Sequence, residues 1–270
     1  MNPESPGSTR IALITGASSG IGRSIAEKFS RQGVHVVLVA RRRDRLDEVA
    51  NGIRQTGGKS SLIQADLTVE EQRGQIYQEV IDNHGRLDIL INNAGLGWYG
   101  YYSDMSWQVA MQLLRVNIEA VAHLTGLFLS GMRRQNRGHI INIGSIAGCF
   151  PNQGTAIYSA SKSFLDAFTS VLNRELTGTE VRCSVARLGP VATEFFQQAA
   201  GLPAGRPVPA QRFSISVERV ADRIWNLIQR PRKVIYIPRG LFIVPWIEVL
   251  FGGIIDQLGP LLLKRKAGHA

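Results

Sequence analysis

The sequence predicts an α/β protein with one doubly wound domain, in which helices cover both faces of a seven-stranded parallel sheet. Short β-branched apolar runs alternate with longer segments of helical periodicity, and this alternation is typical of a parallel sheet. The chain has 270 residues, of which 44% are hydrophobic. That content is enough for one large core, so neither a disulfide nor a metal is needed for stability.

The expected strands are short, rich in β-branched residues and flanked by glycine or polar residues. They cover 11–15, 35–40, 61–66, 87–94, 139–144, 181–186 and 234–238. The expected helices cover 20–32, 44–56, 69–84, 104–135, 156–178 and 217–229. Residues 194–216 are rich in proline, glycine and alanine and predict a long irregular loop after the sixth strand. Such loops commonly hold the ligand, so 194–216 is the expected substrate loop.

The first expected strand runs into a glycine-rich turn, TGASSGIG, at 15–22. Small residues let this backbone approach a pyrophosphate, whose charge the N-terminus of the next helix stabilises. Three residues separate the first two glycines, unlike the GxGxxG form. An ordinary turn needs at most one glycine, so the pattern favours a Rossmann-type nucleotide site. The residues expected at the phosphates are Gly16, Ser18, Ser19, Gly20, Ile21 and Gly22.

The second expected strand ends in three arginines, where NAD-binding domains place an acidic residue against the ribose 2′-hydroxyl. Arg41 and Arg42 would instead pair with the 2′-phosphate of NADP(H) or stack on its adenine. Arg43 fits a solvated helix start. After the third strand, Asp66 would accept a hydrogen bond from the adenine amino group or cap the following turn, with Leu67 beside it.

Five motifs together resemble the short-chain dehydrogenase/reductase family. They are TGASSGIG, NNAG at 92–95, Asn117 within a long helix, Ser145 after the fifth strand, and YSASK at 158–162. The resemblance extends from about residue 9 to 238, with every motif in order. It implies the strand order 3-2-1-4-5-6-7, a nicotinamide cofactor, and hydride transfer between that cofactor and a carbonyl or alcohol.

Tyr158 and Lys162 are four residues apart, so a helix places both on one face. A phenol has a pKa near 10, and a lysine cation about 4–6 Å away would lower it by one to three units. Tyr158 would then give a proton to the carbonyl oxygen during reduction and take it back during oxidation. Ser145 would hold the substrate oxygen beside Tyr158, although a turn cap is the structural alternative.

The resemblance assigns further roles. It implies that Lys162 also binds the nicotinamide ribose and that Asn117 holds a water that relays protons. A buried helix asparagine often only satisfies a neighbouring backbone group, so both readings of Asn117 stay open. Asn92 would end the fourth strand, and its segment would steady the sheet edge. The same segment would line the cofactor groove with Asn93, Ala94 and Gly95.

The family usually has Pro-Gly after the sixth strand, whereas this chain has Leu188 before Gly189. The change leaves cofactor binding expected and the local hydride geometry open. Thr193 matches the threonine that usually contacts the nicotinamide carboxamide, and Val191 lies in the same stretch. Gly189, Val191 and Thr193 complete the expected cofactor contacts.

The chain divides into a catalytic domain at 1–240 and an apolar extension at 241–270. Two acidic residues in the extension, Glu248 and Asp256, argue against a membrane span. Proline and the Gly252–Gly253 pair predict an amphipathic pair of short helices. These helices would cap the substrate pocket, contact another subunit, or lie peripherally in a membrane interface through 241–266.

The net charge of +10 comes from scattered basic residues, without a nucleic-acid-binding motif, so no nucleic-acid partner is expected. Both cysteines, Cys149 and Cys183, fit reduced residues of a cytoplasmic protein. The leading hypothesis is an NADP(H)-dependent oxidoreductase, a homo-oligomer, acting on a lipophilic carbonyl or alcohol of oxoacyl, steroid, retinoid or sphingoid type. The alternatives are a non-catalytic nucleotide-binding scaffold and a membrane-associated assembly factor.

Overall fold

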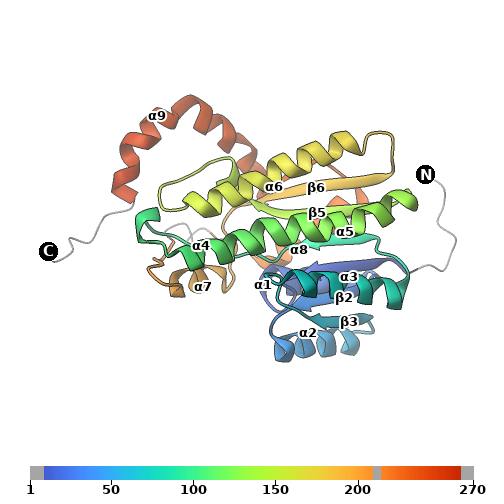
Figure 1. Cartoon of the computed structure of the whole chain (residues 1–270). Helices are drawn as coiled ribbons and strands as arrows, with labels where there is room; N and C mark the ends of the chain where they lie inside the picture. The colour runs from blue at the N-terminus through green and yellow to red at the C-terminus, as the bar shows by residue number, and fades with distance from the viewer. Residues whose placement is uncertain (1–8, 209–213, 263–270) are drawn as a thin grey trace.

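The computed structural model describes residues 9–208 and 214–262. Seven parallel strands form one sheet in the order β3-β2-β1-β4-β5-β6-β7 (Figure 1). The predicted fold class is therefore confirmed. The order reverses between β1 and β4, and the carboxyl ends of these strands open a crevice there, which is where doubly wound sheets bind ligands.

The strands lie at the positions that the apolar runs predict. They are β1 Ile11–Thr15, β2 His35–Ala40, β3 Ser60–Gln64, β4 Ile89–Asn92, β5 Gly138–Ser145, β6 Val181–Leu188 and β7 Val234–Ile237. Six helices of the doubly wound domain also lie at their predicted segments, with α5 forming the second part of the segment 104–135. They are α1 Gly20–Arg31, α2 Arg43–Gln55, α3 Glu70–His84, α5 Ala120–Arg134, α6 Ala156–Glu175 and α8 Val217–Gln229.

The expected helix at 104–135 is interrupted. It begins as α4, Trp107–Leu114, where the Ser106 hydroxyl accepts a hydrogen bond from the Val109 N–H and so caps the helix. A π-helical turn, Arg115–Glu119, joins α4 to α5. Such turns insert one residue into a helix and often occur at functional sites; hydrophobic periodicity does not reveal them.

Trp107–Arg134 is, within the described part of the chain, the one helix long and apolar enough to cross a membrane. Core helices of globular proteins pass the same test. Here Leu124 and Phe128 of α5 are buried against the sheet, as expected of a core helix.

Two expectations outside the sheet are wrong. The 194–216 segment contains a short helix, α7 Phe195–Gly201, although 209–213 lies outside the described residues. The extension forms one turn of 3₁₀-helix, Arg239–Ile243, and one continuous helix, α9 Val244–Leu262, instead of a pair. Pro245 occupies the first turn, where its missing N–H is tolerated, and each glycine costs a helix only about 1 kcal/mol. Residues 263–270, with their basic run, lie outside the described residues.

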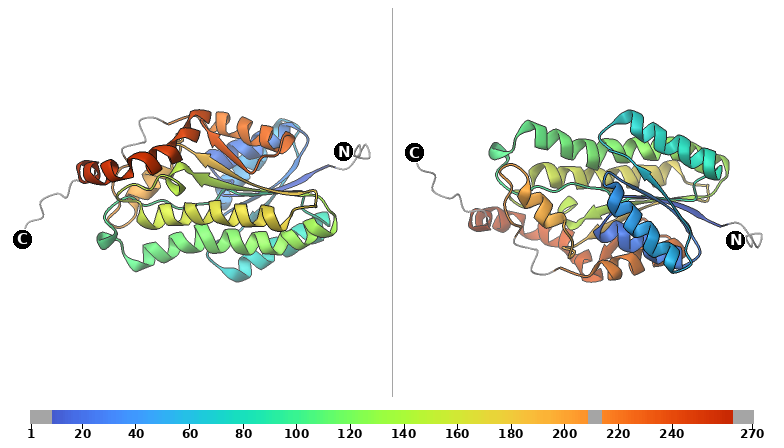
Figure 2. Two further views of the ribbon diagram at one scale, coloured as in Figure 1. Left: turned by 90° about the horizontal axis from the view of Figure 1, so that it is seen from above. Right: turned by 90° about the horizontal axis from the view of Figure 1, so that it is seen from below.

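Two apolar cores enclose the sheet. Helices α1, α2 and α8 bury residues such as Ile25, Leu46 and Ile224 on one face. Helices α3, α5 and α6 bury residues such as Phe128 and Leu172 on the other. Figure 2 shows these two helix layers on opposite sides of the sheet, with α9 extending away from the body.

A buried polar layer joins β4 and β5 to the helices that carry the site. The Asn92 amide donates hydrogen bonds to Asn142 Oδ1 at 2.9 Å and to the Thr125 hydroxyl on α5 at 3.2 Å. The Asn142 amide donates to the Thr169 hydroxyl on α6 at 2.9 Å. Asn92 therefore plays the structural part of its expected role, because its side chain points into this layer.

We expect Asn142→Ala to lower the free energy of unfolding by about 1–3 kcal/mol, because it removes the buried partners of Asn92 and Thr169. Urea unfolding measures the loss. Asn226→Ala on the exposed face of α8 is the control and should change stability by less than about 0.5 kcal/mol. Equal effects of the two substitutions would show that the polar layer does not contribute as described.

Candidate active site

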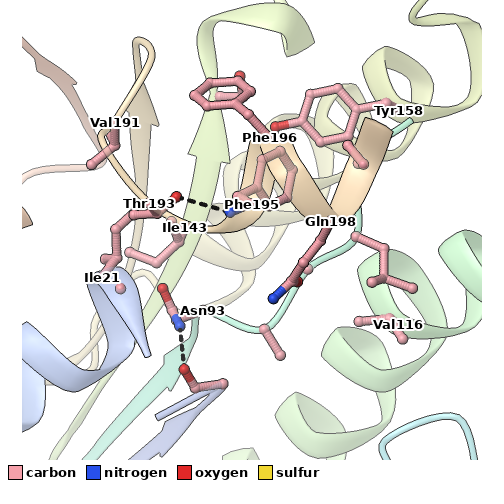
Figure 3. A pocket seen from close by; sticks show the side chains of 18 of the residues that line it. Ile21, Asn93, Val116, Ile143, Tyr158, Val191, Thr193, Phe195, Phe196 and Gln198 are labelled. Carbon is pink, nitrogen blue, oxygen red and sulfur yellow. Dashed lines mark hydrogen bonds between the residues drawn. The ribbon is translucent and has the colours of Figure 1, made fainter. Parts of the chain in front are cut away.

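A cavity of about 610 Å³ lies at the carboxyl ends of the strands. It is lined by eighteen of the residues predicted to bind cofactor or to act in catalysis. They are Gly16, Ser18, Ser19, Gly20, Ile21, Arg41, Arg42, Asp66, Leu67, Asn93, Ala94, Gly95, Ser145, Tyr158, Lys162, Gly189, Val191 and Thr193. Two predicted residues, Gly22 and Asn117, do not line it. Figure 3 shows Tyr158, Phe195 and Phe196 grouped together, with Ile21 and Asn93 further along the cavity.

The glycine loop needs its glycines for two different reasons. Gly16 and Gly20 have φ values of +66° and +52°, a region that side chains disfavour. Gly22 lies behind the loop, where a Cβ atom would come within 2.3 Å of the Gly16 carbonyl oxygen. Gly22 therefore permits close packing of α1 beneath the loop, and its prediction as a cofactor contact is not supported by its position.

Asn93 holds the loop in place. Its side-chain amide donates to the carbonyl oxygens of Thr15 at 2.8 Å and Gly16 at 3.3 Å. The Thr15 hydroxyl accepts from the Asn93 and Ala94 N–H groups, both at 3.0 Å. The end of β1 is thereby joined to the segment after β4, which fixes the glycine loop relative to that segment.

The two arginines lie at the far end of the cavity from the Tyr158 hydroxyl. The Arg42 guanidinium donates to the hydroxyls of Ser18 at 3.2 Å and Ser19 at 2.9 Å. It also approaches Glu194 at 3.4 Å. Arg41 lies 4.0 Å from the Asp66 carboxylate. Both guanidinium groups are half exposed, so they can exchange these weak partners for a phosphate.

Asp66 caps its own turn. Its Oδ1 accepts from the Thr68 N–H at 2.9 Å and from the Thr68 hydroxyl at 2.8 Å. This is the turn-capping alternative of the two, and it leaves Oδ2 at the cavity, toward Arg41. The same carboxylate therefore orders the loop that follows β3 and faces the site.

Three catalytic candidates meet at the end of β5. Ser145 ends that strand, and its hydroxyl lies close enough to the Tyr158 phenol to influence the pKa of that phenol. The same Ser145 oxygen accepts from the Ala147 N–H at 3.2 Å, so the serine also caps the turn after β5. Lys162 lies one turn after Tyr158 on α6, with its ammonium nitrogen 5.9 Å from the phenol ring centroid.

Burial dominates the electrostatics of this group. It raises the pKa of Tyr158 above its ordinary value of 10, and the Ser145 hydroxyl offsets only part of the shift. Burial also lowers the pKa of Lys162 to about 8, against the attraction of Asp166. The expected lowering of the Tyr158 pKa is therefore wrong for the protein alone, because burial outweighs the favourable interactions of the phenolate. The Lys162 ammonium donates to the Ile143 carbonyl at 2.9 Å. The phenol is protonated at neutral pH.

Asn117 lies in the π-helical turn, with its side chain turned away from the cavity. Its Oδ1 accepts from the Leu96 N–H at 2.8 Å, and its amide donates to the Leu96 carbonyl and to the Ser161 hydroxyl. The side chain thus satisfies a neighbouring backbone, as the alternative reading anticipated. Both amide hydrogens of Asn117 are used in these contacts.

Leu188 keeps the backbone regular at the position of the usual proline. It is the last residue of β6, pairs with Ser145 and Ile237, and is buried in the core. Gly189 follows, and its N–H donates to the Ile237 carbonyl at 2.9 Å. The methyl group of Thr193 packs near Gly20, where a Cβ atom would come within 3.0 Å. The chain after β6 therefore lies directly over the glycine loop.

The other end of the cavity is apolar, and motifs did not reveal most of it. Phe195 of α7 lies 5.8 Å from Tyr158 and 5.8 Å from Phe196, between ring centroids. The Trp98 indole N–H donates to the Pro203 carbonyl at 3.1 Å, which ties α7 to the loop after β4. Aromatic residues in the expected loops were the available signal. The residues missed include Trp98, Tyr99, Val116, Gln198, Ala199 and Val208.

A pH-dependent stability follows from the buried lysine. Between pH 8 and 10.5 the unfolded chain binds more protons at Lys162 than the folded protein does, so folding becomes more favourable as pH rises. The free energy of unfolding of the wild type minus that of Lys162→Met should rise by about 2–3 kcal/mol over this range. Urea titrations without cofactor measure it, and a pH-independent difference would contradict the burial described.

Comparisons with known proteins agree with this geometry. Residues 10–201 match the family model described as short chain dehydrogenase. An uncharacterized oxidoreductase of Staphylococcus epidermidis is 32% identical, covering 83% of this chain and 93% of that protein. A short-chain dehydrogenase from Sphingobium yanoikuyae in complex with NADPH is 30% identical, with a TM-score of 0.79 over 97% of this chain and 98% of that one. One from Burkholderia phymatum in complex with NAD is 25% identical, with a TM-score of 0.82 over 91% and 95%. The chain is an oxidoreductase that belongs to the short-chain dehydrogenase/reductase family.

Proposed function

We propose that this protein is an NADP(H)-dependent oxidoreductase that interconverts a lipophilic carbonyl compound and its alcohol. The observation that carries the proposal is a single cavity with two chemically different ends. Tyr158, Ser145 and Lys162 lie near an aromatic wall, while Arg41 and Arg42 lie beside the glycine loop. The catalytic domain in this proposal is 1–240, and 241–270 is a helical extension.

The residues present fit a dinucleotide. The glycine loop brings its backbone to the cavity without side chains in the way, and the N-terminus of α1 offers a favourable dipole to a pyrophosphate. Gly16 to Ile21 would hold the phosphates, Asp66 and Leu67 the adenine side, and Lys162 and Thr193 the nicotinamide side. The bound cofactor supplies the hydride.

The protein supplies the proton and the orientation. Ser145 and the Tyr158 phenol would both donate hydrogen bonds to the substrate oxygen, which becomes negatively charged as reduction proceeds. Tyr158 then transfers its proton to that oxygen. A phenol that burial keeps protonated at neutral pH is ready to donate its proton in this step. The Lys162 cation nearby stabilises the phenolate that results.

The apolar end of the cavity supports a lipophilic substrate. Phe195, Phe196 and Trp98 line it, and α7 covers it. A polar substrate would lose its hydration there without gaining enough partners. Oxoacyl, steroid, retinoid and sphingoid carbonyl compounds all fit this description. The cellular setting of the proposal is a cytoplasmic homo-oligomer.

NADPH preference rests on the two arginines. We expect Arg41→Ala and Arg42→Ala each to lower kcat/KM for NADPH by about 10- to 100-fold, the loss of a charge-assisted contact, with little change for NADH. Arg43→Ala is the matched control, because Arg43 is paired with Asp47 on the surface of α2. Initial rates with both cofactors measure the ratio. If the wild type uses NADH equally well, the arginine assignment is wrong and the fold assignment is unaffected.

Tyr158→Phe tests the proton donor. We expect kcat to fall by at least about 100-fold across lipophilic ketones and aldehydes, while NADPH still binds, because only the acid is lost. Tyr99→Phe removes the hydroxyl of another tyrosine that lines the cavity. Burial raises the pKa of Tyr99, and the charged groups that act on it are Arg206 and Tyr101. The Tyr99→Phe variant should retain activity within a few-fold. A wild type that binds NADPH but reduces nothing in the panel would favour the non-catalytic scaffold.

A further inference from the structure

The helix α9 and the turn before it expose an unusually large apolar surface. Ten large apolar side chains are exposed among the described residues, and seven of them lie between 242 and 254. They are Phe242, Ile243, Trp246, Val249, Leu250, Phe251 and Ile254. Exposed apolar patches of this kind mark contact surfaces. The only sizeable contact of α9 with another described element is with the turn Arg239–Ile243 that precedes it.

The apolar side chains of α9 face outward. Glu248 and Gly252 are one turn apart, and the Glu248 carboxylate lies over Gly252. One oxygen of that carboxylate is buried and has no hydrogen-bond partner among the described residues. Trp246 and Leu250 lie on the opposite side and are exposed, and Val249, next to Glu248, is exposed as well. An apolar side that faces outward while the acidic side is sheltered fits a partner that is itself apolar.

Positive charge gathers near the turn that leads into α9. Arg239 begins the turn that leads into the helix, and its charge acts on Arg223 of α8 together with those of Arg219 and Arg232. Burial first, and then these like charges, lower the pKa of Arg223. None of the four arginines forms an ion pair with another described residue. In sequence, the helix is followed by Lys264, Arg265 and Lys266.

From these features we propose that α9 and its arginine cluster form a docking surface for an anionic lipid bilayer. Exposed apolar side chains insert at the headgroup–acyl boundary, and adjacent cations attract anionic headgroups. A second copy of this chain is a poorer occupant, because it would bring another set of unpaired arginines and a net charge of +10 to the same surface. Two acidic residues in the helix still argue against a transmembrane span.

Docking in this way would place the cavity close to the membrane. Leu241, in the turn before α9, packs where a Cβ atom on Gly189 would come within 2.9 Å of its side chain. Gly189 lines the cavity. A lipophilic substrate dissolved in the bilayer would then have a short path to the aromatic wall. The docking itself involves no catalytic residue and does not depend on the proposed hydride transfer.

The test uses the full chain without cofactor and vesicles of phosphatidylcholine, with or without about one-third phosphatidylglycerol. We expect the wild type to cosediment with anionic vesicles and only weakly with neutral ones. Leu250→Ser should weaken binding about tenfold through the lost burial of one large side chain. Arg239→Gln should weaken it about fivefold, with the Arg contribution disappearing at high salt.

Two tryptophans provide a matched control. Trp246 on α9 and Trp107 on α4 have relative exposures of 63% and 62%. Trp246→Ser should weaken vesicle binding about tenfold, whereas Trp107→Ser should leave it unchanged. Circular dichroism checks that each variant folds. Absence of binding to anionic vesicles, or equal losses in the two variants, would overturn the proposal. A dimer that dissociates in Leu250→Ser without any vesicle binding would assign the surface to a second copy.

Discussion

The close approach of α6 to the end of β5 is the contact on which the site depends. Gly148 permits it, because a Cβ atom there would lie 2.8 Å from the Lys162 backbone. At this separation the Lys162 ammonium reaches the Ile143 carbonyl, and the phenol of Tyr158 reaches Ser145. A larger residue at 148 would push the helix outward and separate the proton donor from the residue that orients the substrate.

The cavity combines two environments that one uniform surface could not provide. Its phosphate end is polar and partly exposed, so arginines can remain charged and exchange partners. Its substrate end is aromatic and covered by α7. Burial there keeps the Tyr158 phenol protonated and lowers the pKa of the Lys162 ammonium. Because the two ends lie along one crevice at the sheet reversal, a single elongated ligand can meet both.

Regular features of the fold were predictable from local sequence. Each buried strand is recognisable in the sequence as a short apolar run, and the glycine loop, Ser145 and YSASK lie where the topology brings strand ends together.

Local sequence patterns did not predict the features that depend on tertiary packing. Gly22 and Asn93 both belong to motifs expected to contact the cofactor, yet only Asn93 lines the cavity. Gly22 packs against the Gly16 carbonyl on the other side of the loop. The direction of the Tyr158 pKa shift depends on burial, which is not visible in the spacing of two side chains. Proline and glycine suggested a broken extension, but Pro245 lies in the first turn and the cost of the two glycines is small enough for α9 to continue through them.

The π-helical turn between α4 and α5 fixes how many residues this part of the chain must contain. Buried residues recur at spacings of four through Val109, Leu113, Asn117 and Val121, which is slower than the 3.6-residue repeat of a regular helix. The wider π-helical turn accommodates the extra residue. One continuous helical segment can therefore cover the substrate pocket with α4 and the sheet with α5. A chain shorter by a single residue there would rotate one half relative to the other, and either the pocket or the core would lose its cover.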